Sequence, residues 1–457
     1  MAGRAATSRI IRGRHAISVN DPGHPIPRGW RRVALGDVAD LGTGHTPSRH
    51  HPEYWDGGVP WIGIRDAGAH HGRVIVDTMQ TVSDLGLANS AARLLPKDTV
   101  CLSRTASVGY VVKMGREMAT SQDFVTWSCL EPLDADYLMN ALLAEGQDIR
   151  RFGEGSTHTT IYFPEVKAFH IDLPPKPEQR RIVAKLDAMT AGLSRARVEL
   201  DRVPMLTQKL RTKILLEAFS GDFPTSALRD LVHFVTSGSR GWAKYYADTG
   251  PAFIRVGDVR RRNIALELND VQSVQPPSGA EGARTALLAG DVVITITADL
   301  GRVGVVPESL GPGFVNQHVA LARPLNVEMA PWIGWYLSSE AGQGQMLAKN
   351  RGVTKAGLGL DDIRDVVIPV PTADVRASML NKINTAFASA DRLEAEAARA
   401  RALLDRLESA ILAKAFRGEL VPQDPNDEPA SVLLDRIRAE RADAPKPKRG
   451  RRAAASA

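Results

Sequence analysis

The chain has 457 residues, 43% of them hydrophobic and 24% charged, which excludes wholesale disorder and predicts two or three domains. It contains no run of about 18 apolar residues, so we expect a cytoplasmic protein without a membrane-spanning helix. Its net charge of +6 lies in the two ends, because residues 1–20 hold four arginines and residues 444–457 hold five lysines or arginines, neither with an acid. The body has no basic excess, and only local clusters can indicate a nucleic-acid ligand.

Residues 1–28 are predicted to form a basic, disordered arm, although an arginine-rich, acid-free opening is also typical of a transit peptide. A first domain follows over residues 29–172, where short β-branched runs alternate with turns rich in glycine and proline. Its two cysteines, Cys101 and Cys129, lie in apolar strand-like stretches without metal-ligand spacing. We therefore predict free, buried thiols in a reducing compartment.

Polar loops of the first domain carry its candidate nucleic-acid contacts. Their hydroxyl, guanidinium and imidazole groups suit base edges and phosphates, although the same groups also cap turns. Two His-His pairs lie in these loops, but they lack the helical spacing and carboxylate support of a metal site, and we predict none. A glutamine after one predicted strand has a side chain that can bond adenine with two hydrogen bonds. The candidates are Thr46, Arg49, Arg65, Arg73, Gln122, Thr157 and Thr159.

A long helix is predicted over residues 173–221. Its apolar residues recur in alternating steps of four and three, which is the period of a coiled-coil seam. The run LPPKPEQ supplies the prolines and acids of a helix start, and Gly221 lies where a C-terminal glycine belongs. Pro204 inside this pattern is expected to kink the helix. The predicted seam includes Ile182, Leu186, Leu193, Leu200 and Leu210.

A second domain is predicted over residues 222–370, where short β-branched runs again alternate with turns rich in glycine and proline. Its loop SGSRGWAKYY interleaves cations with aromatic rings, which suits phosphate contact and stacking on bases. Alternatively, Trp242 and one tyrosine fill the core. Gln122 and Gln317 occupy matching positions, and this equivalence favours a structural hydrogen bond as much as base reading. The candidates are Arg240, Trp242, Lys244, Tyr246, Arg255, Arg260, Gln317, Lys349, Thr354 and Lys355.

A second long helix is predicted over residues 371–420, and it repeats the first. The run ILLEAFSG at residues 214–221 returns as ILAKAFRG at residues 411–418, and the seam repeats with the same shift. Two narrow apolar stripes of this length need partners, so we predict that the helices pair with each other. We predict that residues 421–457 form a tail with a short helix and a basic, disordered end. The second seam includes Ile383, Leu393, Leu404, Leu407 and Ile411.

Five motifs occur in an order that resembles the DNA-specificity subunit of type I restriction-modification enzymes: GWRRVALGDVADLGTGHTPS, YW-x-GG-VPWI, LPPKPEQRRIVAKLD, SGSRGWAKYY and FIRVGDV. The resemblance spans about Gly29 to Leu420, although the second helix opens with VPTADVRASM instead of the PPKPEQRRIV of the first. It implies an α+β fold. Two mixed α/β target-recognition domains would be separated by two long helices that form an antiparallel coiled coil with a pseudo-two-fold internal repeat.

The resemblance also implies a function. Each domain would read one half of a bipartite site in double-stranded DNA, and the helices would act as a ruler. Catalysis would belong to two adenine methyltransferase subunits and to restriction/translocase subunits, which would bind S-adenosylmethionine, ATP and Mg²⁺. This chain would hold no catalytic residue and no cofactor, and its sequence contains no N/D-P-P-Y/F and no G-x-x-x-x-G-K-[ST] motif. Two alternatives stay open: an enzyme with its own recognition domains, and a non-catalytic coiled-coil scaffold.

Overall fold

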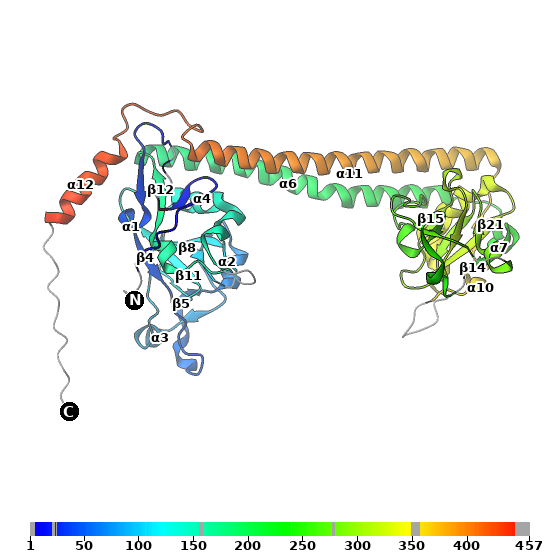
Figure 1. The fold of residues 1–457 in the computed structure, drawn as a ribbon, viewed down its shortest axis with the longest axis horizontal. Helices are drawn as coiled ribbons and strands as arrows, with labels where there is room; N and C mark the ends of the chain where they lie inside the picture. The colour runs from blue at the N-terminus through cyan, green and yellow to red at the C-terminus, as the bar shows by residue number, and fades with distance from the viewer. Residues whose placement is uncertain are drawn as a thin grey trace. The chain divides into compact units, whose positions relative to one another are not determined.

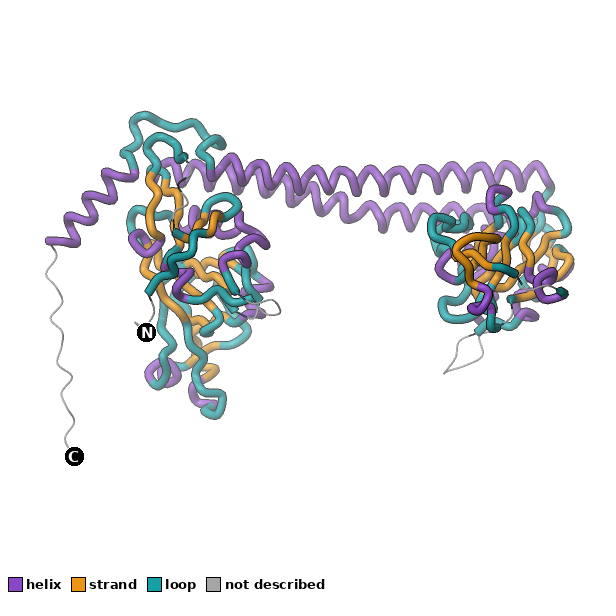
Figure 2. The backbone as a smooth tube through the Cα atoms, viewed as in Figure 1, coloured by secondary structure: helices purple, strands orange, loops and turns teal. Residues whose placement is uncertain are grey.

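The computed structural model of the chain divides into two compact units. Unit 1 comprises Met1–Val198 and Arg401–Ala457, and unit 2 comprises Glu199–Ala400. Each unit combines a globular part of strands and short helices with segments of long helix (Figures 1 and 2). The described residues are 5–20, 23, 25–105, 107–154, 159–238, 240–276, 279–348 and 357–443.

The globular part of unit 1 contains three sheets. A four-stranded antiparallel sheet has the order β1 (Ile11–Arg12), β2 (Ile17–Val19), β12 (Phe169–Leu173) and β3 (Arg31–Ala34). A five-stranded sheet has the order β4 (Ala39–Thr43), β11 (Phe124–Cys129), β8 (Val100–Ser103), β9 (Val111–Met114) and β6 (Val74–Ile75). A three-stranded sheet has the order β10 (Ala119–Thr120), β5 (Trp55–Ile62) and β7 (Thr81–Val82). The helices are α1 (Leu35–Val38), α2 (Ile64–Ala69), α3 (Asp84–Ala88), α4 (Ala135–Glu145) and α5 (Phe163–Lys167).

The first residues of the chain correct one prediction. The sequence predicts a disordered arm over residues 1–28, but the side chains of β2 are buried and this strand pairs with β12. The carboxylate of Glu145, fully buried at the end of α4, accepts the backbone N–H groups of residues 14–17 at 2.5–3.0 Å. One carboxylate thus satisfies four backbone donors and fixes this segment, a contact that no local pattern reveals.

Unit 2 is built on the same plan. A sheet with the order β14 (Val232–Ser237), β21 (Val319–Pro324), β18 (Val292–Thr295) and β19 (Val303–Val305) lies beside one with the order β16 (Gln272–Val274), β15 (Tyr246–Ile254), β20 (Gly313–Val315) and β17 (Ala286–Leu287). A two-stranded sheet joins β13 (Thr225–Ala227) to β22 (Val367–Pro369). The helices are α7 (Ala280–Thr285), α8 (Ala330–Ser338), α9 (Glu340–Ala348) and α10 (Leu360–Arg364).

Hydrogen bonds at corresponding places show the internal repeat. In both units a short strand pairs in parallel with the long strand of its sheet, β10 with β5 and β20 with β15. The hydroxyl of Ser103 donates to the carbonyl of Ser107 and accepts from the N–H of Tyr110. In unit 2 the hydroxyl of Thr295 donates to the carbonyl of Asp299 and accepts from the N–H of Arg302. The hairpins β8–β9 and β18–β19 therefore turn in the same way.

Two helices of 44 residues each, α6 (Lys176–Phe219) and α11 (Ala373–Phe416), contribute to both units. In unit 1 the start of α6 shares a core with the end of α11, and in unit 2 the end of α6 shares a core with the start of α11. The two helices are therefore paired antiparallel within each unit, as the sequence predicts. Helix α6 continues through Pro204 without interruption.

The burial of the predicted seam residues divides them into two groups. Seven of them are packed: Ile182, Leu186, Leu193, Ile383 and Ile411 are buried, and Leu200 and Leu404 are half-buried. Three residues correct the prediction, because Leu210, Leu393 and Leu407 are 39%, 49% and 48% exposed.

Ion pairs explain these three exposed leucines. The guanidinium of Arg211 is buried and binds the carboxylates of Asp391 at 2.5 Å and Glu394 at 2.6 Å. The guanidinium of Arg197 binds Asp405 at 2.6 Å and Glu408 at 2.7 Å in the same way. Successive side chains on a helix point about 100° apart. When the charged residue of each adjacent pair faces the partner helix, the leucine before it points toward solvent.

The chain after α11 packs back on unit 1. Helix α12 (Ala430–Asp443) buries Ala430 and Leu434 in the core of that unit. The guanidinium of Arg181 on α6 binds the carboxylate of Asp427 at 2.6 Å. The basic end, residues 444–457, lies outside the described residues.

The two cysteines are free, Cys101 buried on β8 and Cys129 half-buried on β11. Burial raises the pKa of both thiols, that of Cys129 to about 12. Among the described residues, no helix is long and apolar enough to cross a membrane, and no three His, Cys, Asp or Glu side chains gather as metal ligands.

Candidate nucleic-acid interface

Four loops of unit 1 meet beside β11, and we call them the loop cluster of unit 1. Three backbone hydrogen bonds join them: His45 N–H to Thr120 carbonyl at 2.9 Å, Arg104 N–H to Asp123 carbonyl at 2.8 Å, and Ile161 N–H to Arg104 carbonyl at 2.9 Å. The loops come from distant parts of the sequence, and strand pairing in the sheets brings them together. The cluster comprises residues 44–48, 104–105, 121–123 and 159–161.

Polar side chains tie these loops to one another. The hydroxyl of Thr46 donates to the side-chain carbonyl of Gln122. The hydroxyl of Thr105 donates to the carboxylate of Asp123 at 2.7 Å. The structure thus brings together Thr46 and Gln122, two of the predicted site residues, and places the half-buried Thr159 in the same cluster. Thr157 lies outside the described residues.

Arg104 belongs to this cluster, although the sequence did not single it out. Its Nη2 donates to the backbone carbonyl of Gln122 at 3.2 Å, and its guanidinium lies 4.9 Å from the ring of Phe163. Its Nε is buried and has no hydrogen-bond partner among the described residues. Burial lowers the pKa of this guanidinium, while Asp123 acts in the opposite direction. Arg104 as a whole is half-buried, and guanidinium groups bind phosphates and base edges. A single arginine in a strand-like stretch gives no sequence signal for this role.

Of the other arginines predicted in unit 1, Arg49 borders the loop cluster and two lie apart from it. Arg49 places its guanidinium 3.7 Å from the ring of Trp55 and donates to the side-chain carbonyl of Gln80 at 2.9 Å. Arg65 on α2 and Arg73 are exposed, and their side chains make no hydrogen bond or ion pair with described residues. Trp55 in turn donates its indole N–H to the carbonyl of Ser48 at 3.3 Å, so Arg49 lies at the edge of the cluster, whereas no described contact links Arg65 or Arg73 to it.

Unit 2 has the corresponding loop cluster. Ile296 N–H donates to His318 carbonyl at 2.9 Å, and Leu358 N–H donates to Ile296 carbonyl at 2.9 Å, which repeats the two bonds of Arg104 in unit 1. Gly238 N–H donates to Asn316 carbonyl at 3.2 Å. The cluster comprises residues 238, 240–241, 296–301, 316–318 and 357–359. The same backbone frame therefore carries different side chains in the two units.

Gln317 is held by its neighbour in this second cluster. Its amide nitrogen lies 2.9 Å from Nε2 of His318, and Nδ1 of that imidazole is hydrogen-bonded to the hydroxyl of Thr297. Arg240 is exposed in the same cluster. Lys349, Thr354 and Lys355 lie outside the described residues.

Trp242 corrects a second prediction. Its side chain is only 2% exposed, and its ring stacks on that of Phe253 at 5.2 Å with an interplanar angle of 5°. The ring of Phe314 packs against it at 5.4 Å. This indole covers one face of the β15–β20 sheet and cannot stack on a base, because its aromatic neighbours already enclose it.

The remaining predicted residues of unit 2 are more accessible. Lys244 places its ammonium 4.9 Å from the ring of Tyr245, and Tyr246 is 44% exposed. The other two candidates are already paired with acids: Arg255 lies 3.8 Å from the carboxylate of Asp258, and Arg260 binds Glu267. A nucleic acid that contacts Arg255 or Arg260 would compete with these carboxylates.

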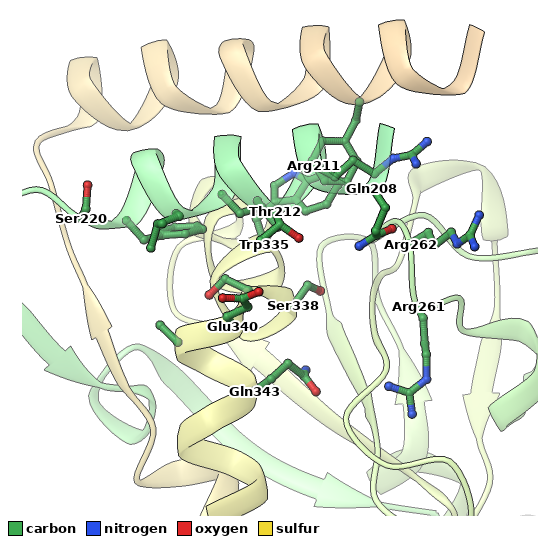
Figure 3. Close-up of a pocket in the computed structure, with 16 residues that line it drawn as sticks. Gln208, Arg211, Thr212, Ser220, Arg261, Arg262, Trp335, Ser338, Glu340 and Gln343 are labelled. Atoms are coloured by element: carbon green, nitrogen blue, oxygen red, sulfur yellow. The ribbon is translucent and has the colours of Figure 1, made fainter. Parts of the chain in front are cut away.

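A separate cavity of about 260 Å³ lies in unit 2 between α6, α8 and α9 (Figure 3). Its lining includes Arg211 and Trp335, whose Nε and indole Nε1 are buried without a hydrogen-bond partner among the described residues. Arg261 and Arg262 also line it, and they pair with Asp299 and Glu394. None of the nucleic-acid candidates predicted from the sequence lines this cavity.

Residues 27–199 match the family described as the type I restriction modification DNA specificity domain. The chain is also 27% identical over 452 residues to the type I restriction enzyme StySPI specificity subunit of Salmonella potsdam, across 91% of this chain and 96% of that protein. Residues 27–199 therefore carry a type I restriction modification DNA specificity domain. A second relative, the EcoBI specificity subunit of Escherichia coli, is 24% identical over 308 residues, a match that spans 60% of this chain and 64% of that protein.

Two solved structures share the fold of this chain. A chain from a study of complex assembly in the type I restriction-modification system has a TM-score of 0.69 at 21% identity, across 87% of this chain and all of that one. The HsdS subunit from Thermoanaerobacter tengcongensis has a TM-score of 0.57 at 21% identity, across 87% of this chain and 99% of that one. At this level of identity the similarity shows the fold alone, namely two mixed α/β domains and long helices.

Proposed function

We propose that this chain is the DNA-reading subunit of a type I restriction-modification complex. The loop cluster of each unit reads one half of a bipartite site in double-stranded DNA. One observation carries this proposal: the two clusters share two backbone hydrogen bonds at matching places, whereas Arg104 and Asp123 in unit 1 correspond to Ile296 and His318 in unit 2. The backbone arrangement of the loops is repeated, and the side chains that it presents differ. Such an arrangement suits the reading of two different half-sites.

Catalysis is assigned to partner subunits. We expect two adenine methyltransferase subunits, because the two units of this chain repeat the same backbone arrangement and each can bind one subunit. These subunits and the restriction/translocase subunits would bind S-adenosylmethionine, ATP and Mg²⁺, and this chain would transfer no methyl group. Incubation of the purified chain with labelled S-adenosylmethionine and duplex DNA tests this assignment, since turnover by the chain alone would contradict it.

Selection from a random duplex pool tests the reading function. The full chain, in complex with its methyltransferase subunits, should enrich a split motif with two fixed halves. Arg49→Ala in unit 1 and Arg240→Ala in unit 2 form a matched pair of variants. Each should relax only its own half, at about 1–3 kcal/mol for each lost base contact. Enrichment of no motif would refute the function, and equal relaxation of both halves by either variant would refute the assignment of one half to each unit.

A further inference from the structure

The matched glutamines, Gln122 and Gln317, lie at the same place in the two loop clusters. Each follows the short strand that pairs in parallel with the long strand of its sheet. Gln122 is exposed and Gln317 is half-buried. The same residue type at matching places would give both units the same contact with DNA. The contacts can differ only if neighbouring residues orient the side-chain amides of Gln122 and Gln317 differently.

In unit 1 a neighbouring residue forms a hydrogen bond with the side-chain amide oxygen of Gln122. The hydroxyl of Thr46 donates to Oε1 of Gln122, and the amide nitrogen has no partner among the described residues. The neighbouring carboxylate of Asp123 is bound by Thr105 at 2.7 Å and Ser121 at 3.1 Å, and it makes no hydrogen bond with that nitrogen. Both N–H groups of Gln122 therefore remain available to a ligand.

In unit 2 a neighbouring residue forms a hydrogen bond with the side-chain amide nitrogen of Gln317. Nε2 of Gln317 lies 2.9 Å from Nε2 of His318, and the imidazole must accept this hydrogen bond. The proton of the neutral ring then sits on Nδ1 and is donated to the hydroxyl of Thr297. The backbone of His318 is fixed as well, because its N–H donates to Asn316 Oδ1 at 3.0 Å and its carbonyl accepts from Ile296 at 2.9 Å. No described residue donates to the side-chain carbonyl oxygen of Gln317, which can accept a hydrogen bond from a ligand.

We propose that Gln122 and Gln317 determine specificity with opposite polarity. Gln122 donates to an acceptor edge in the major groove, such as guanine N7 and O6. Gln317 accepts from an exocyclic amino group, that of adenine or cytosine. Thr46 and His318 act as positioning residues that set the direction of each amide. This inference rests on the proposed function of the chain, and it explains how one residue type at matching places can read different bases.

Replacement of each glutamine by glutamate tests the proposal, because glutamate has the same shape but offers only acceptors. Gln122→Glu removes the donors, so it should weaken binding to the selected site by about tenfold or more and move the preference at one base pair toward adenine or cytosine. Gln317→Glu keeps the acceptor, since Thr297 can donate to Nδ1 and His318 can then donate to the carboxylate. This variant should keep the same base preference, with a loss of affinity of less than about threefold.

The measurement is selection from a duplex pool, followed by titration of the enriched sites, with the full chain in complex with its methyltransferase subunits. A second pair of variants separates reading from folding: Thr46→Val removes the hydroxyl and should broaden the preference at the base pair of Gln122, whereas Thr46→Ser should preserve it. Equal losses for the two glutamate variants, or unchanged base preference in Gln122→Glu, would overturn the proposal. A wild-type complex that selects no motif would instead refute the proposed function.

Discussion

Arg211 offers the sharpest test of how the two long helices pair in unit 2. Its side chain is 4% exposed and binds two carboxylates, Asp391, which is 57% exposed, and Glu394, which is 24% exposed. Removal of one partner from a buried ion pair costs about 3–5 kcal/mol. Because the carboxylate of Asp391 regains water easily, we expect Arg211→Met to cost about 2–3 kcal/mol. For a unit of this size the loss corresponds to a fall in melting temperature of about 4–12 °C.

Arg202→Met is the matched control for this variant. Arg202 lies on the same helix and pairs with Glu199, but both side chains are more than half exposed. Such pairs contribute little, and we expect a change of less than about 2 °C. Calorimetry on the full chain measures the shift, and hydrogen exchange of α6 residues 205–216 localises it. A loss in Arg211→Met no larger than that in Arg202→Met would refute the buried ion pair as a determinant of helix pairing.

The pH dependence provides an independent check. The hydrogen bond from Arg211 lowers the pKa of Glu394 below its ordinary value of 4.5. A carboxyl group with a lowered pKa stabilises the folded state above its unfolded pKa, and this stabilisation is lost as the pH falls through the folded value. The difference in melting temperature between wild type and Arg211→Met should therefore be largest near neutral pH and should shrink below about pH 4.5.

Three further variants test single residues. Arg104→Met should weaken binding to all duplexes and reduce the slope of log K against log salt by about 1, as measured by titration at several salt concentrations; an unchanged slope would exclude a phosphate contact. Trp242→Ala should destabilise unit 2 by about 3–5 kcal/mol in thermal unfolding without a change of motif, and a folded variant with a new motif would contradict its core role. Glu145→Gln places an amide N–H group against backbone donors, so it should cost about 1–3 kcal/mol and speed hydrogen exchange of residues 14–17; unchanged exchange would argue against this anchor.

Periodic patterns in the sequence predict the large elements well. The repeated seam and the repeated helix ends identify α6, α11 and their antiparallel pairing, because an apolar stripe on a long helix has few ways to be buried. The pattern fails at Leu210, Leu393 and Leu407, where a neighbouring charge takes the inner position. An ion pair between helices depends on two distant residues, so a pattern along one segment cannot reveal it.

The loop clusters show the same limit more strongly. Thr46, Gln122 and Arg240 could be named from residue type alone, since polar loop residues are common ligands of nucleic acids. Arg104 could not, because its role arises from strand pairing that brings four separate loops together. Trp242 has the composition of a stacking residue, and only its burial against Phe253 shows that the indole belongs to the core. Position in the fold, more than residue type, decides these roles.

The two cysteines have a practical consequence for measurements on this protein. Maleimide and iodoacetamide dyes react with thiolates, and burial keeps Cys101 and Cys129 in the thiol form at neutral pH. A cysteine introduced at an exposed position of each unit would therefore accept a fluorophore selectively, without replacement of either native residue. Energy transfer between two such dyes would report the separation of the units, and its change when DNA is added, in the chain with its own core intact.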